Sequence, residues 1–100
     1  MILTERETER GLLVTVCDPD VLGRTFADGE VSLTVTESFY ACDGAEEAVD
    51  EDAVVETLRR AVVGNLVGTR TVDLAVEHGF VDPENVLDLD GTKHAQFLRL

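Results

Sequence analysis

The hydrophobic periodicity of this chain changes between its first third and its middle, and this change constrains the fold most. Across residues 30–37, apolar side chains alternate with polar ones, which predicts a strand with one buried face and one polar face. After Asp50 the apolar residues recur at helical spacing instead, which predicts an amphipathic helix. A chain of 100 residues that contains both patterns fits a single α+β domain.

Turn and capping residues divide the chain into short elements. Gly11 marks a hairpin turn between two strands, and Asp18-Pro19 and Asp82-Pro83 each suit the start of a short helical turn. The predicted elements are strands at residues 2–8, 12–17, 30–37, 86–89 and 94–100, a main helix after Asp50 whose apolar stripe reaches Leu66, with a bend or an end near Gly64, and a second helix between Thr69 and Gly79. The order β-β-β-α-α-β-β predicts a small, mainly antiparallel sheet of about five strands with two helices packed on one face.

Carboxylates outnumber cations and are spread along the whole chain. There are 21 Asp or Glu residues and 8 Lys or Arg residues, so the formal net charge is −13, and Lys93 is the only lysine. At about 1 M salt the Debye length is about 3 Å, so surface carboxylates maintain solubility without strong mutual repulsion. We therefore expect a halophilic protein, in which acidity neither supports nor excludes RNA as a partner.

The sequence predicts a cytoplasmic protein with no membrane association. No apolar run approaches the roughly 20 residues of a membrane-spanning helix, and the first residues lack the basic and apolar regions of a secretory signal. In a reducing compartment we expect Cys17 and Cys42 to be free thiols. Their spacing is not that of a zinc-binding cysteine pair.

The sequence contains no phosphate-binding glycine loop, zinc-protease motif or nucleophile elbow, and we predict neither a cofactor nor a metal. One catalytic hypothesis pairs Cys17, at the end of a strand, with His94 as its base. The simpler interpretation is that Cys17 is a buried core residue. A metal site built from His78, His94 and a carboxylate follows no known spacing, and His78 suits the C-terminal end of its helix.

Polar residues near the C-terminus are the best binding candidates. His94 and Gln96 share one face of the predicted last strand, next to Lys93, where they would contact a phosphate or a base edge. The alternative is the solvated face of an edge strand. Asn65 falls on the apolar stripe of the main helix, where a buried amide needs partners. It either ties the helix to a loop or lies at the rim of a pocket.

The few aromatic residues allow two interpretations. An exposed Tyr40 would stack on an RNA base. The alternative places Phe39 and Phe97 in the core and leaves Tyr40 half-buried with its hydroxyl in water.

Several of these features together resemble one small archaeal family. The features are Cys17-Asp18, Leu22-Gly23 with Phe26, Phe39-Tyr40, Ala61 with Asn65-Leu66-Val67-Gly68, Gly79, and His94-Ala95-Gln96. The chain resembles the archaeal domain-of-unknown-function 424 family, as a haloarchaeal-type member. It departs from the family pattern at Ala41-Cys42, where a glycine pair is usual, and at Lys93, where a proline often stands. The resemblance implies a cytoplasmic protein of α+β fold and no established activity.

We expect a non-enzymatic binding protein for RNA or a ribonucleoprotein in translation or RNA processing. One alternative is a small enzyme that uses Cys17 with His94. Another is a protein–protein adaptor or a homodimer formed through an edge strand. The candidate binding residues are Asn65, Lys93, His94, Gln96 and Tyr40. Convergence of Cys17, Asn65, His94 and Gln96 in one pocket would favour a shared site.

Overall fold

A mixed five-stranded sheet forms the centre of the computed structural model, which describes residues 1–40 and 49–99. The order across the sheet is β1-β2-β5-β7-β6. The strands are β1 (Ile2–Thr8), β2 (Gly11–Cys17), β5 (Val63–Val67), β6 (Leu87–Leu89) and β7 (Thr92–Leu98). Neighbouring strands are antiparallel except β2 and β5, which are parallel. The predicted α+β class is confirmed. The predicted loop that contains Cys42 lies outside the described residues.

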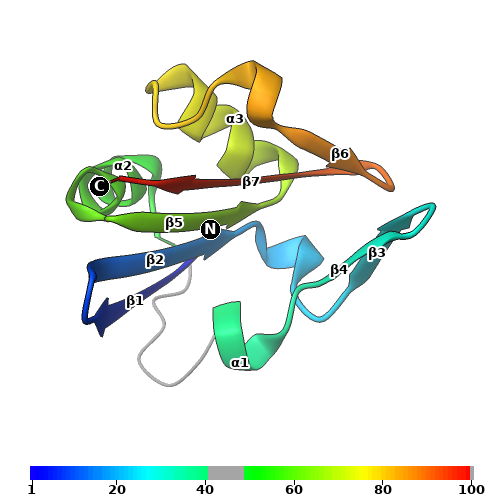
Figure 1. Cartoon of the computed structure of the whole chain (residues 1–100), viewed down its shortest axis with the longest axis horizontal. Coiled ribbons are helices and arrows are strands. Elements are labelled where there is room, and N and C mark those ends of the chain that lie inside the picture. The colour runs from blue at the N-terminus through cyan, green and yellow to red at the C-terminus, as the bar shows by residue number, and fades with distance from the viewer. Residues whose placement is uncertain (41–48, 100) are drawn as a thin grey trace.

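Two helices, α2 (Glu51–Arg60) and α3 (Thr69–Glu77), cover one face of the sheet (Figure 1). The Asp50 carboxylate accepts a hydrogen bond from the Ala53 amide at 2.8 Å, which confirms the predicted start of the main helix. Between helices and sheet lies the larger hydrophobic cluster. Its members include Leu3, Val14, Val16, Val54, Leu58, Leu66, Val72, Ala75 and Ala95. None of the described helices is long and apolar enough to cross a membrane.

A hairpin of β3 (Thr25–Asp28) and β4 (Val31–Thr34) forms a separate two-stranded sheet. The hairpin and the short helix α1 (Glu37–Tyr40) lie on the side of the main sheet away from α3 (Figure 1). A second hydrophobic cluster joins them to the sheet through Phe26, Val35, Tyr40, Cys17 and Val67. The alternating segment at residues 30–37 is therefore a short strand followed by a helical turn, and it is not part of the main sheet.

The central strand β5 corrects the predicted length of the main helix. That helix ends at Arg60, and Asn65 and Leu66 belong to β5. This segment forms a strand because it pairs with β2 on one side and with β7 on the other. A β-carbon at Gly64 would overlap the Phe97 ring, so this glycine makes room for the ring of its β7 partner to pack over β5.

Candidate functional site

One row of polar side chains crosses four strands on the sheet face opposite α2 and α3. Thr4 pairs with Thr15, Thr15 with Asn65, and Asn65 with Gln96. Because paired residues on neighbouring strands point to the same side, these four side chains share one face. His94 lies on this face in the next row, opposite Val67 of β5.

Helix α1 closes the half of this row that lies on β1 and β2. The Thr4 hydroxyl donates to the Tyr40 carbonyl at 2.9 Å, and the Thr15 hydroxyl donates to the Phe39 carbonyl at 3.3 Å. The Arg6 guanidinium also donates to the Phe39 carbonyl, at 3.0 Å, and lies over the Phe39 ring. The last carbonyls of a helix need such donors, so this half of the row serves the fold.

The half of the row on β5 and β7 remains open. Asn65 is half-buried and Gln96 is exposed, and no hydrogen bond joins either side chain to a described residue. Next to them, Val63 is half-buried and Leu98 is 56% exposed. Burial lowers the pKa of His94, so its imidazole is neutral at pH 7. We call Val63, Asn65, His94, Gln96 and Leu98 the open patch.

The strand residues on this face include no carboxylate. Alternation and register place the strand acids Glu5, Glu7 and Asp88 on the opposite side. In a chain with 21 Asp or Glu residues, the accessible positions of this face on β5 and β7 instead hold amides, an imidazole and aliphatic groups. The open patch therefore differs chemically from the strand residues on the opposite face of the sheet, which include Glu5, Glu7 and Asp88.

Cys17 lies on the same sheet face but deep beneath the hairpin. It is fully buried, and burial is the main cause that raises the pKa of its thiol to about 11. Its strand partner is Val67, whose partner on the other side is His94. Two strand spacings, about 10 Å, therefore separate the Cys17 and His94 backbones, too far for a hydrogen bond between thiol and imidazole.

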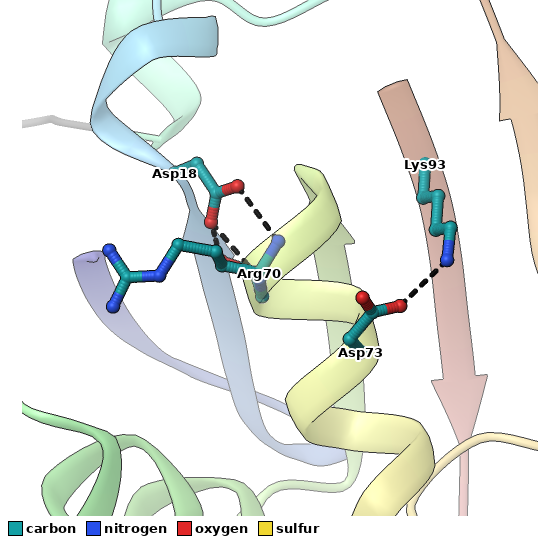
Figure 2. A network of polar contacts seen from close by, with 5 residues as sticks. Asp18, Arg70, Asp73 and Lys93 are labelled. Atoms are coloured by element: carbon teal, nitrogen blue, oxygen red, sulfur yellow. Dashed lines mark hydrogen bonds and ion pairs between the residues drawn. The ribbon is translucent and has the colours of Figure 1, made fainter. Parts of the chain in front are cut away.

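Tyr40 and Lys93 lie away from the open patch. Tyr40 is only 4% exposed, and burial, with a smaller contribution from Cys17, raises its pKa to about 12. The prediction of an exposed ring for base stacking is therefore wrong, because this ring is part of the second hydrophobic cluster. Lys93 points to the helix side and forms an ion pair with Asp73 at 2.7 Å (Figure 2).

Asp18 joins the ends of the parallel strands, a role that the sequence did not suggest. The expected short helical turn does begin at Pro19, with Asp18 at its N-cap position, but the Asp18 side chain makes no hydrogen bond to that turn. Its carboxylate instead accepts hydrogen bonds from the Arg70 and Thr71 amides, both at 3.0 Å, at the start of α3 (Figure 2). A β-carbon at Gly68 would overlap this carboxylate. The arrangement is a long-range helix cap.

A cavity of about 310 Å³ adjoins this cap. Its charged lining mixes two arginines, Arg24 and Arg70, with Asp18, Asp20 and Asp90. Two arginines against three aspartates leave a formal charge of only −1, so the lining selects strongly for neither an anion nor a cation. Within residues 1–40 and 49–99, no three His, Cys, Asp or Glu side chains come together as metal ligands.

The structure thus brings together three of the predicted residues. Asn65, His94 and Gln96 lie close together on one accessible sheet face, whereas Cys17 lies two strands from His94, buried beneath the hairpin. The sequence missed Val63 and Leu98 as their neighbours, since these follow only from the register between β5 and β7.

Comparisons with known proteins agree with this fold. The structure of an uncharacterized conserved protein from Methanopyrus kandleri is similar, with a TM-score of 0.76 and 22% sequence identity over 99% of this chain and 93% of that one. A search of curated proteins gives no match. The family model described as "Protein of unknown function (DUF424)" matches residues 5–100. The chain therefore belongs to the DUF424 family.

Proposed function

We propose that this protein is a non-enzymatic RNA-binding protein of a salt-rich cytoplasm, and that the open patch contacts RNA within a ribonucleoprotein of translation or RNA processing. One observation carries the proposal: adjacent amides without partners among the described residues occupy a sheet face on which the strands place no carboxylate. A polyanion meets less repulsion at this patch than at the carboxylate-bearing strand positions of the opposite face, in a chain of net charge −13.

Charge attraction contributes little to this binding. Counterion release supplies little free energy at high salt, and Lys93 points to the other side of the sheet. Hydrogen bonds and apolar contacts therefore provide the affinity. This requirement fits a surface that combines Asn65 and Gln96 with Val63 and Leu98.

The side chains of the patch suit unpaired bases. Paired residues such as Asn65 and Gln96 have β-carbons roughly 5 Å apart, so their amides present several donors and acceptors within reach of one base edge. The neutral His94 ring adds one donor and one acceptor. Single-stranded RNA exposes base edges in this way, whereas the bases of an A-form duplex are largely inaccessible.

The geometry favours binding over thiol catalysis. Cys17 is buried, its pKa of about 11 keeps the thiol protonated, and His94 lies two strands away. A nucleophilic thiol needs a lowered pKa and an adjacent base. The environment of Cys17 supplies neither.

Ultraviolet crosslinking to cellular RNA in molar potassium chloride tests the proposal. We expect the wild-type protein to recover RNA, and the double variant His94→Ala, Gln96→Ala to recover several-fold less. Lys93→Ala is the matched control, because Lys93 lies on the same strand and faces the helices. Recovery at background level, or recovery that the double variant leaves unchanged, contradicts the proposal.

A further inference from the structure

The cavity of about 310 Å³ beside Asp18 lies at the carboxyl ends of the parallel strands β2 and β5. Asp18 directly follows β2, and Thr69 and Arg70 open α3 just after β5. The turn between β6 and β7, at residues 90–91, closes another side. In open α/β sheets, ligands bind at this end of parallel strands, and a cavity of this volume can hold a small molecule.

The floor of this cavity contains a hydroxyl without a partner. Thr92 is only 5% exposed and lines the cavity, but its side chain forms no hydrogen bond with a described residue. Within residues 1–40 and 49–99, every buried side-chain nitrogen or oxygen that is sealed from solvent has a partner. The Thr92 hydroxyl is therefore reached from the cavity, where it can form a hydrogen bond with a ligand.

Asp18 adds a second buried acceptor to the same cavity. It is 6% exposed, and its Oδ1 atom accepts from both the amide and the hydroxyl of Thr71. Its Oδ2 atom accepts only from the Arg70 amide, at 3.0 Å (Figure 2), and so retains an acceptor position. A charged N–H donor such as an ammonium suits this carboxylate and the neighbouring hydroxyl.

Two guanidinium groups supply the opposite preference at the exposed rim. Arg24 and Arg70 line the cavity and are exposed, and neither guanidinium forms an ion pair with a described residue. Arg24 lies over the Phe26 ring, 4.9 Å from its centroid. Guanidinium groups bind carboxylates through paired hydrogen bonds. Because such bonds act at contact, a Debye length of about 3 Å at 1 M salt does not abolish them.

This lining suits a molecule that carries both charges better than a simple ion. An anion alone would meet Asp18, Asp20 and Asp90, and a cation alone would meet the two arginines. A zwitterion matches the acceptors at the floor and the guanidinium groups at the rim. Val21 and Phe26 also line the cavity, and their apolar side chains suit a short aliphatic group.

We propose that this cavity binds a small free amino acid. The ammonium of the ligand donates to Asp18 Oδ2 and to the Thr92 hydroxyl, and its carboxylate accepts from Arg24 and Arg70. No residue of the open patch lines the cavity. The site is therefore separate from the proposed RNA contact.

NMR titration of the unmodified protein with L-alanine at about 1 M potassium chloride tests the proposal. Propionate and ethylammonium are the matched controls, because each keeps one charged group of alanine and lacks the other. We expect alanine to shift the amide signals of Gly91 and Thr92 to saturation, and each control to bind at least about tenfold more weakly. The absence of a saturable shift with alanine overturns the proposal, and so does equal affinity for alanine and either control.

Two variants test the two ends of the ligand separately. Thr92→Val removes the hydroxyl with little change of shape and should weaken alanine binding about tenfold. Arg70→Gln should weaken alanine binding by a similar factor and leave the weak binding of ethylammonium unchanged, because ethylammonium has no carboxylate. Arg59→Gln is the control, since Arg59 is exposed on α2 and does not line the cavity. If Thr92→Val or Arg70→Gln binds alanine as tightly as Arg59→Gln does, the proposal is wrong.

Discussion

The two faces of the main sheet contrast although they are built from the same strands. On the helix side, Val14 and Val16 of β2 and Leu66 of β5 pack into a closed hydrophobic cluster. On the other side, the hairpin and α1 cover only part of the sheet and leave Asn65, Gln96 and Leu98 accessible. Alternate residues of a strand point to opposite sides. Core residues and candidate binding residues are therefore immediate neighbours in the sequence, as Leu66 and Asn65 are in β5.

Truncation of one leucine on each face should give the largest difference in the free energy of unfolding between the two faces. Leu66 is fully buried on the helix side, whereas Leu98 is 56% exposed in the open patch. Leu66→Ala should lower the free energy of unfolding by roughly 2–5 kcal/mol through lost burial and a cavity, and Leu98→Ala should change it by less than about 0.5 kcal/mol. Urea unfolding at high salt measures both. Similar losses in the two variants would show that the open patch is part of the core.

Removal of the Asp18 carboxylate should have the next largest effect. Asp18→Ala deletes the acceptor of the Arg70 and Thr71 amides and of the Thr71 hydroxyl, and should cost roughly 1–3 kcal/mol. Asp20→Ala is the control, since Asp20 is exposed on the adjacent turn. Equal unfolding midpoints for the two variants would contradict the role of Asp18 as the cap of α3.

The Cys17 thiol should be inert in the folded protein. Its folded pKa of about 11 lies above its ordinary value of 9.0, so its contribution to stability is full below pH 9 and is lost as the pH rises through 11. In a Cys42→Ser background, iodoacetamide at about pH 8 should react about 100-fold more slowly with folded than with unfolded protein. Rapid labelling without unfolding would restore the enzyme hypothesis.

The titration of His94 should have a smaller effect on the free energy of unfolding, and this effect should appear at acidic pH. Burial lowers its folded pKa below the ordinary value of 6.5, so its contribution to stability is complete above pH 6.5 and is lost as the pH falls through the folded pKa. Between about pH 7.5 and 5.5, the wild-type protein should lose more stability than His94→Gln. Parallel losses measured by urea unfolding would mean that the His94 ring is solvated.

Local signals predicted much of this fold. The cap at Asp50, the turn at Gly11 and the shared face of His94 and Gln96 are encoded within a few residues, and the structure confirms them. The extent of β5 was missed because its apolar residues also continue a helical stripe, and only pairing with β2 and β7 makes it a strand.

The missed features of the site depend on long-range contacts. Asn65 meets Gln96 only through the register of β5 with β7. Asp18 caps a helix more than 50 residues away, so its sequence neighbours carry no signal of this role. Burial of Tyr40 likewise follows from the position of α1 on β1 and β2.

The central claim is that the open patch contacts RNA. Carboxylates introduced either into the patch or on the helix side of the sheet test this claim most directly. The double variant Asn65→Asp, Gln96→Glu adds two negative charges to the open patch, and Arg59→Glu makes the same change in net charge on an exposed position of α2. Fluorescence anisotropy of a labelled single-stranded RNA at about 1 M potassium chloride measures the affinity. The account predicts a loss of about tenfold or more for the double variant and less than about twofold for Arg59→Glu. Equal affinities for the two variants would contradict it.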